Sequence, residues 1–292
     1  MNKTVSIILL LLATTVLPAE ARTGRRLLHV LQTSVPESTT LDQGDMEFVY
    51  DYMFNTDTIS RTDVDHEQMM LQVGKNGISK FSSWKNLTVD SIIPTLTSDQ
   101  LMANAEKLRN GPSMTIFKNH PAGRLTHVEK VYHDWLRYEE EMPKPDWQIT
   151  DSVKILLGYE VRQAKATFRG REWTAWFTED IPVMDGPWKL CGLPGLILEA
   201  HDATDDYSFT CTGIKGNAKR PVSIYNVDYN DTTRKRFYDT LHRYEINPYG
   251  YANAVGGVKI TVTDEAGNPD PTAFDPMELS YDYIERDWRE KR

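Results

Sequence analysis

Gly-Tyr-Glu-Val-Arg-Gln-Ala-Lys-Ala-Thr-Phe-Arg-Gly-Arg-Glu-Trp-Thr-Ala-Trp-Phe-Thr, residues 158–178, is the stretch of this sequence that decides the fold. Side chains alternate in character up to Phe168, which is typical of a β-strand with one buried face. Arg169-Gly170 suits a two-residue turn, and residues 172–178 return as the partner strand. Connections this short join antiparallel strands, because a parallel crossover needs about a dozen residues or more. The stretch therefore predicts an antiparallel hairpin.

Shorter strand signals lie on both sides of this hairpin. Residues 74–77, Gly-Lys-Asn-Gly, predict a second tight turn, because Asn-Gly accepts the positive φ that such turns require. Residues 202–206 predict a turn between two further apolar runs. The predicted strands are 46–54, 70–73, 79–82, 114–117, 124–132, 135–138, 196–201 and 207–212. The sequence therefore predicts a mainly β (α+β) fold, a curved antiparallel sheet or open half-barrel.

One or two short helices are predicted to pack on this sheet, followed by a C-terminal helical extension. Residues 98–109 begin with a serine suited to a helix N-cap and continue with apolar residues at helical spacing. Residues 231–246 show the same spacing and end before Pro248. Apolar residues between 277 and 288 predict a final short helix, whereas residues 247–276, rich in Gly, Pro and Asn, predict a loop.

The composition is that of an acidic globular protein. The 292 residues carry 33 Lys and Arg against 42 Asp and Glu, which gives a net charge of −9. Binding to a phosphate backbone needs a clustered basic surface, so we expect no nucleic-acid partner. Charged residues at 26% and aromatic residues at 10% exclude wholesale disorder.

The N-terminus has the features of a signal peptide. Lys3 precedes an apolar core at residues 5–17, and Ala19-Glu-Ala21 fits the small-x-small cleavage rule. This core is shorter than the roughly 20 residues that a membrane-spanning helix needs. We expect cleavage near Ala21, a periplasmic or secreted product, and no integral membrane segment. The predicted organisation is a signal peptide at 1–21, a polar leader at 22–44, an antiparallel β domain at 45–226, and a helix and loop extension at 227–292 packed on that domain.

Two turn motifs precede the strand at 196–201. Gly186-Pro187 predicts the first turn. In the second, Gly192-Leu-Pro-Gly195, Pro194 fixes φ, and Gly195 supplies the positive φ of a type II turn. The segment precedes a strand and lacks the Lys-Ser/Thr of a nucleotide-binding loop. We therefore predict a structural role for these turn residues, which redirect the chain into the sheet.

Residues 192–197, Gly-Leu-Pro-Gly-Leu-Ile, resemble the name-giving motif of the GLPGLI family of exported Bacteroidota proteins. The resemblance extends over residues 150–200 and includes Arg169-Gly-Arg171 and Thr174-Ala-Trp176. It implies a periplasmic protein with a mostly antiparallel β fold, comparable to the open half-barrels of lipoprotein carriers, and no established biochemical role. Family members often carry Cys where this chain has Val161, a departure that weakens any disulfide inferred by analogy.

Cys191 and Cys211 are the two cysteines of the chain. An oxidising compartment permits a disulfide between them. In the predicted hairpin Cys211 lies opposite residue 197 or 198, so a bridge requires the loop at 192–195 to fold back and bring the Cα atoms within about 7 Å. The sequence leaves this pairing open. Such a bridge would be structural, because neither CxxC spacing nor a cationic neighbour indicates a reactive thiol.

The sequence contains no complete catalytic motif, and we expect no catalytic residue or cofactor from it. If residues 127–133 form a strand, His127, Glu129 and His133 share one face. The first two could converge on a metal ion, with His120 as a candidate third ligand, whereas His133 would lie some 20 Å from His127. His127 and Glu129 are therefore candidate metal ligands, and polar residues on a solvated sheet face are the simpler interpretation.

Aromatic residues are the candidates for ligand binding. Trp173 and Trp176 are predicted on opposite faces of one strand, and Trp188 adds a third indole. A curved sheet lined by such residues could hold an acyl chain or an apolar peptide. The predicted function is an exported, non-catalytic protein that binds an apolar ligand, peptide or envelope partner on its concave face. An envelope hydrolase with a dispersed site and a metal-handling protein using His127 and Glu129 remain as alternatives.

Overall fold

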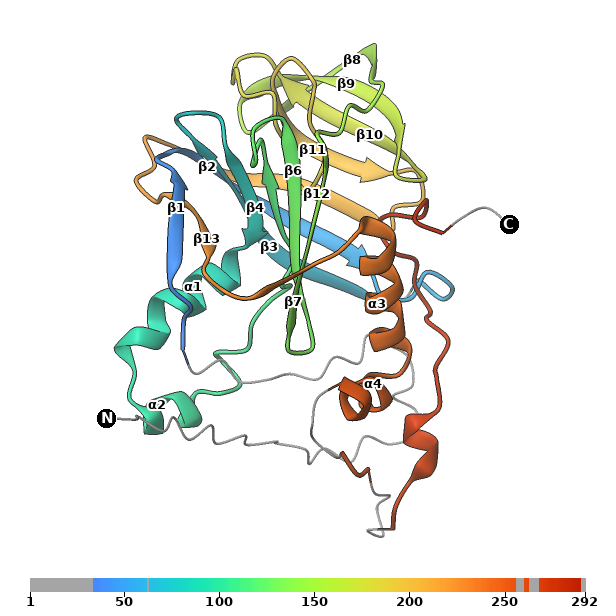
Figure 1. The fold of residues 1–292 in the computed structure, drawn as a ribbon. Coiled ribbons are helices and arrows are strands. Elements are labelled where there is room, and N and C mark those ends of the chain that lie inside the picture. The colour runs from blue at the N-terminus through green and yellow to red at the C-terminus, as the bar shows by residue number, and fades with distance from the viewer. Residues whose placement is uncertain (1–33, 62, 256–259, 263–267, 290–292) are drawn as a thin grey trace.

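The large sheet is open and mainly antiparallel. The computed structural model describes residues 34–61, 63–255, 260–262 and 268–289. Within these ranges twelve strands join in the order β14-β7-β6-β5-β4-β3-β2-β12-β11-β10-β9-β8, and β1 pairs with β13 in a second sheet (Figure 1). β14 runs parallel to β7, whereas the other neighbouring strands are antiparallel. The prediction of a mainly β fold is confirmed.

Each predicted strand run lies within or overlaps a strand of the structure, whereas β1, β8, β13 and β14 were not predicted. The strands are β1 (Ser38–Asp42), β2 (Gly44–Asn55), β3 (Val64–Gly74), β4 (Ser79–Ser83), β5 (Thr115–Lys118), β6 (Arg124–Val131), β7 (Asp134–Glu141), β8 (Gln148–Leu156), β9 (Tyr159–Phe168), β10 (Arg171–Thr178), β11 (Leu196–Asp202), β12 (Tyr207–Gly216), β13 (Val222–Tyr225) and β14 (Tyr229–Asp231). The helices are α1 (Trp84–Ile92), η1 (Ile93–Thr95), α2 (Ser98–Ala103), α3 (Arg234–Ile246), α4 (Pro248–Val255) and η2 (Pro271–Phe274).

The hairpin at residues 158–178 forms as predicted. Arg169 and Gly170 link β9 to β10 with φ values of +54° and +78°. A two-residue turn with positive φ at both positions matches the right-handed twist of its strands, which is why such turns favour glycine. The second predicted turn also forms, with Gly77 at a φ of +84° between β3 and β4.

Aromatic residues fill the core where β2, β10 and β12 meet the turn region. The Trp173 and Phe209 rings stack with centroids 6.2 Å apart, and Phe209 stacks on Tyr52 at 4.8 Å. Trp188, in the turn region, packs on Trp173 at 5.6 Å. Stacked and edge-on ring pairs add about 0.5–1.5 kcal/mol each beyond the burial of their surface. The turn region is therefore part of the core.

The helix predicted at residues 98–109 is shorter than the sequence indicated. α2 ends at Ala103, and its N-cap is Thr97, whose hydroxyl accepts from the Gln100 backbone N–H while the Gln100 side chain returns a bond to Thr97. Asn104 ends the helix because its side-chain amide donates to the Gln100 carbonyl at 2.8 Å. The expected loop at 247–276 contains α4 and η2, and α1 was not predicted.

The predicted final helix at residues 277–288 is wrong. Residues 277–289, which we call the C-terminal strap, run along the sheet and α3 without a helix (Figure 1). Arg171 of β10 donates to the Tyr283 carbonyl at 2.9 Å and to the Ile284 carbonyl at 3.1 Å. Those carbonyl groups would accept from residues four positions later in a helix. The strap therefore takes its shape from β10.

The C-terminal part of the segment predicted as a polar leader contains a strand. Residues 38–42, assigned to the polar leader, form β1, and Asp42 is buried. The signal peptide and the rest of the leader up to residue 33 lie outside the described residues. The extension packs on the same sheet, because Phe237 and Leu241 of α3 join Val131 and Tyr138 in one apolar cluster. In the described ranges no helix is long and apolar enough to cross a bilayer.

Candidate functional site

The turns at residues 185–195 are held by a buried lysine from β5. Lys118 Nζ contacts the Asp185 carboxylate and donates to the Gly186 carbonyl at 2.6 Å. Asp185 also accepts from the Ser79 hydroxyl at 2.5 Å. A lysine side chain that is 3% exposed needs such partners, because an unpaired buried charge is costly. The turn motif therefore connects β4 and β5 to the loop before β11.

The turn at Gly195 differs from the predicted type II turn. The Gly195 N–H donates to the Leu193 carbonyl at 2.8 Å, which closes a three-residue turn centred on Pro194. The φ of Gly195 is +151°, far from the value of about +80° in a type II turn. A Cβ atom on Gly195 would lie 2.0 Å from the Thr178 carbonyl oxygen. Glycine is therefore required by the close approach of β10 as well as by φ.

None of the three tryptophans predicted as ligand contacts lines the cavity described below. Trp173 and Trp188 are 1% and 0% exposed and pack in the core. Trp176 lies on the opposite face of β10, as alternation predicts, with Lys154 Nζ 4.3 Å from its ring centroid. Two of these residues therefore serve packing, and only Trp176 offers part of its indole to the surface.

Both cysteines are free and buried. The Cys191 thiol contacts the Pro143 carbonyl at 3.5 Å, and the Cys211 thiol contacts the Gly213 carbonyl at 3.5 Å. Burial raises the pKa of each thiol to about 11, so both stay protonated at neutral pH. The disulfide that the sequence left open is not formed in this structure.

Both thiols are expected to resist a chromogenic disulfide reagent in the native protein at pH 8 and to react on unfolding. A thiol reacts through its thiolate, and burial suppresses both the thiolate and the access of the reagent. The measurement is a thiol count without reductant, before and after addition of guanidinium. Finding no reactive thiol in the unfolded chain would show that Cys191 and Cys211 are bridged after all.

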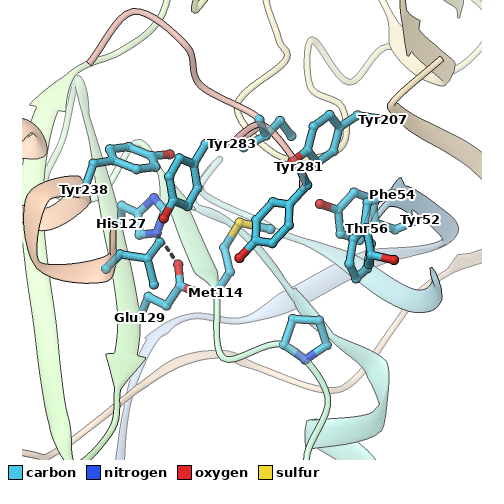
Figure 2. Close-up of a pocket in the computed structure, with 13 residues that line it drawn as sticks. Tyr52, Phe54, Thr56, Met114, His127, Glu129, Tyr207, Tyr238, Tyr281 and Tyr283 are labelled. Atoms are coloured by element: carbon cyan, nitrogen blue, oxygen red, sulfur yellow. Dashed lines mark hydrogen bonds and ion pairs between the residues drawn. The ribbon is translucent and has the colours of Figure 1, made fainter. Parts of the chain in front are cut away.

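A cavity of about 70 Å³ lies where the sheet, α3 and the C-terminal strap meet. We call it the tyrosine pocket, because five of its lining residues are tyrosines (Figure 2). Its lining residues are Tyr52, Phe54, Thr56, Pro112, Met114, His127, Glu129, Tyr207, Tyr238, Leu241, Tyr281, Tyr283 and Ile284. The lining combines six aromatic rings with one carboxylate and one imidazole, which makes this cavity the candidate site.

His127 and Glu129 lie side by side on β6, as period-two geometry predicts. The His127 Nε2 and Glu129 Oε2 atoms are 3.2 Å apart, and the imidazole is 1% exposed. The other ring nitrogen, Nδ1, lies 3.0 Å from the Tyr138 hydroxyl on the neighbouring strand β7. The pair therefore faces the pocket from the sheet, in a buried rather than a solvated setting.

Tyr138 links His127 to a buried lysine of the turn region. Lys189 Nζ donates to the Tyr138 hydroxyl at 2.9 Å, since an ammonium group can only donate. In a neutral imidazole whose Nδ1 accepts from this hydroxyl, the ring proton is on Nε2 and points at Glu129. Burial raises the pKa of Tyr138 well above its usual value, with Glu285 and Glu140 adding to the rise, so the phenol keeps this proton.

The aromatic lining forms two groups of rings. On the sheet side Tyr52 stacks on Phe54 at 5.0 Å and on Tyr207 at 6.4 Å. On the other side Tyr283 meets Tyr238 edge-on at 5.7 Å and Tyr281 edge-on at 6.1 Å. Figure 2 shows Tyr281 between the His127 and Glu129 pair and the rings of Tyr52 and Phe54. Because Tyr283 meets Tyr238 and Tyr281 edge-on, the faces of neighbouring rings in this wall point in different directions.

The described part of the chain contains no group of three or more His, Cys, Asp or Glu residues placed to hold a metal ion. His127 and Glu129 do approach each other, as predicted. His120 packs instead against Phe117, with ring centroids 6.0 Å apart. His133 packs against Tyr132, with ring centroids 3.9 Å apart. The predicted metal ligands are thus a two-residue pair that hydrogen-bonds internally.

Sequence reasoning found the two polar residues of the pocket and missed its aromatic ones. Tyr238 lies on α3, and Tyr281 and Tyr283 lie on the strap, more than 100 residues from β6 in the chain. The local sequence around these tyrosines predicts helices and carries no sign of the cavity. The cross-strand register places Tyr138 opposite His127. This pairing could have indicated the contacts that join Tyr138, His127 and Glu129.

A short part of the chain is similar to a family of unknown function. A family model described as a protein of unknown function (Porph_ging) matches residues 162–199, which contain β10 and the turn motif. No curated protein matches. Two solved structures of PNGF-II, in different space groups, are similar at 14% identity with TM-scores of 0.46 and 0.45, over 68% of this chain. This chain spans 33% and 32% of the length of those two structures.

Proposed function

We propose that this chain is an exported, non-catalytic binding protein of the bacterial envelope, and that the tyrosine pocket holds its ligand. The observation that carries the proposal is the composition of the pocket. Ligand sites are concave, mostly apolar, and carry a few polar groups that orient the ligand. Six aromatic rings beside the His127 and Glu129 pair have this character.

The N-terminal sequence supports export. Lys3, the apolar core at 5–17 and Ala19-Glu-Ala21 have the order of a cleavable signal peptide. The resemblance of residues 192–197 to an exported family agrees with this. Periplasmic or surface localisation of the product is part of the proposal.

The hydrogen bonds of His127 support a binding role over hydrolysis. A general base needs an imidazole nitrogen that can accept the proton of a nucleophile. Here Nδ1 is taken by Tyr138, and Nε2 lies against Glu129. The imidazole thus fixes the Glu129 side chain and has no ring nitrogen left for a serine or a water molecule.

The size of the pocket limits what it can enclose. An apolar cavity of about 150 Å³ admits benzene. The tyrosine pocket has about half that volume, which suits a headgroup or the end of a side chain and is too small for an acyl chain. An apolar peptide or envelope partner would therefore place one residue in the pocket.

Protein isolated from its native envelope is expected to retain a small molecule or peptide in native mass spectrometry. Tyr281→Ala opens one wall of the pocket at a partly exposed position and is expected to abolish retention with little change in melting temperature. The matched control is Trp176→Ala, a partly exposed aromatic residue outside the pocket, which is expected to retain the ligand.

Three results would contradict the proposal. Loss of the ligand in Trp176→Ala together with retention in Tyr281→Ala would move the site to the outer face of β10. An empty wild-type protein that hydrolyses an acyl, glycosyl or peptide substrate would establish the hydrolase alternative. A mature N-terminus that still carries residues 1–21 in the cytoplasmic fraction would disprove export.

A further inference from the structure

We propose that the C-terminal strap occupies a site that also binds a linear segment of a partner protein, and that the partner displaces the strap. The expected partner segment has two aromatic residues two positions apart, followed by an aliphatic and an acidic residue, as residues 281–285 do. This inference names the partner of the tyrosine pocket and rests on the proposed function. Its basis is the way in which the strap is held.

The first part of the strap is tied to the loop between β2 and β3. The Thr58 N–H and hydroxyl donate to the Ser280 carbonyl at 2.7 and 3.0 Å. The Ser280 hydroxyl donates in return to the Thr56 carbonyl at 3.0 Å. Hydrogen bonds to the main chain are the means by which proteins bind extended peptides. The strap is therefore held here as a peptide would be.

The next residues of the strap are held by side chains of the sheet. The Tyr207 hydroxyl donates to the Asp282 carbonyl at 2.5 Å. Arg171 donates to the carbonyls of Tyr283 and Ile284. The strap itself contains no helix or strand. Its main chain is thus bound by donors from distant parts of the sequence, and such bonds do not depend on which side chains the bound segment carries.

The side chains of residues 281–285 give the site its selectivity. Tyr281 and Tyr283 line the tyrosine pocket, and Ile284 joins the main apolar cluster. Glu285 is 0% exposed. In peptide recognition the main chain supplies affinity, and the places for particular side chains supply specificity. A segment that replaces the strap must therefore offer two rings, an aliphatic side chain and an acid in the same order.

Without the carboxylates of the strap, the surroundings of Glu285 would have an excess of positive charge. Lys189 Nζ lies 2.7 Å from Glu285 Oε1. Arg234 and Arg169 approach the other carboxylate oxygen, the latter at 3.7 Å. Outside the strap, Glu140 is the one carboxylate among the described residues that pairs with any of these three cations. Buried cations without a counter-ion are costly, so a replacement segment must bring an acidic residue.

The strap competes with a partner from within the chain. A tethered segment acts at an effective concentration on the order of 1 mM. A free peptide of the same sequence therefore binds the wild type weakly, and a change that loosens the strap without altering its site strengthens binding. Glu285→Gln is such a change, because it removes a charge from the strap and leaves Lys189, Arg169 and Arg234 in place.

The test titrates a fluorescent peptide of residues 277–289 with the protein purified after expression of the whole chain, followed by fluorescence anisotropy. Glu285→Gln protein is expected to bind the peptide roughly tenfold or more tightly than the wild type. The same peptide carrying Glu285→Gln is expected to bind this protein roughly tenfold or more weakly. Glu179→Gln, an exposed carboxylate paired with Arg162, is the matched control and is expected to bind like the wild type.

A disulfide between the loop and the strap tests displacement while the ion cluster is intact. Thr58→Cys together with Ser280→Cys places two thiols on residues whose main chains are hydrogen-bonded to each other. The reduced double variant lacks both hydroxyl groups of this contact, so it is expected to bind the peptide more tightly than the wild type. The oxidised double variant is expected not to bind, because its strap cannot leave the site.

Failure of a folded Glu285→Gln protein to bind the peptide would overturn the inference, as would equal binding by the oxidised and reduced double variant. A dimer of Glu285→Gln in size-exclusion chromatography would also overturn it, because the second strap would then come from another copy of this chain. If Glu285→Gln does not fold, the two redox forms of the double variant decide. Each failure leaves the proposed function intact when the wild type retains a ligand in native mass spectrometry and Tyr281→Ala loses it.

Discussion

Glu285→Gln is expected to lower the free energy of unfolding by about 3–5 kcal/mol, since removal of one member of a buried ion cluster leaves the others uncompensated. Glu285 and Lys189 are both 0% exposed, with Lys189 Nζ 2.7 Å from Glu285 Oε1. Arg234 contacts the other carboxylate oxygen, and Lys189 also donates to Glu140 at 2.6 Å. The cluster joins the C-terminal strap to the turn region, α3 and β7.

The same substitution is expected to make the free energy of unfolding depend less on pH in the acid range. Burial alone would raise the pKa of Glu285, but Lys189, Arg234 and Arg169 together lower it to about 2. A carboxyl whose pKa is lower in the folded state stabilises the fold above its unfolded pKa of about 4.5 and loses that contribution as the pH falls through about 2. Between these two pKa values the wild type is expected to lose about 3 kcal/mol of its free energy of unfolding. Urea unfolding at pH 7, 4 and 2.5 measures both effects.

Glu179→Gln is the matched control for Glu285→Gln. Glu179 pairs with Arg162 at 3.6 Å, and the two side chains are 58% and 45% exposed. Exposed ion pairs contribute about 0–1 kcal/mol. Equal losses in the two variants, or a wild-type acid dependence that Glu285→Gln leaves unchanged, would show that the buried cluster does not hold the strap.

Gly195→Ala is expected to prevent folding at 37 °C or to cost several kcal/mol of unfolding free energy. The added methyl group would lie 2.0 Å from the Thr178 carbonyl oxygen, and the residue has a φ of +151°. Both the clash and the backbone conformation oppose any side chain, and unusual backbone conformations alone cost roughly 1–3 kcal/mol. Thermal unfolding followed by circular dichroism measures the loss.

Two further glycines separate the causes. Gly192 has a φ of +90° and open space around its added Cβ, so Gly192→Ala is expected to cost only the conformational part, about 1–2 kcal/mol. Gly216 has open space and no such φ, so Gly216→Ala is expected to be nearly neutral. A Gly195→Ala protein as stable as Gly192→Ala would show that β10 does not approach the turn as closely as described.

The elements that could be predicted from the sequence are those whose shape is set by their own residues. The hairpin at 158–178 follows from alternation and a turn with two positive φ values. The helix α3 follows from helical spacing and a proline at its end. His127 and Glu129 could be paired for the same reason, because a strand alone determines which side chains share a face.

The features that could not be predicted depend on partners distant in the chain. The apolar spacing of residues 277–288 indicated a helix, and Ile284 and Trp288 are indeed buried. Arg171, more than 100 residues earlier, takes the carbonyl groups that a helix would use. The tyrosine pocket was missed for this reason, since two of its rings lie on that strap.

If the chain is exported from its N-terminus, as proposed, the position of the strap sets an order of folding events. In the described residues all strands of the large sheet precede residue 232, whereas the pocket residues Tyr281, Tyr283 and Ile284 come last in the chain. A partly translocated chain can thus pair its strands before the cavity has its outer wall. Under the proposed function, ligand binding would wait until nearly the whole chain had crossed, and a protease that cut before residue 277 would remove the outer wall of the pocket and weaken the fold.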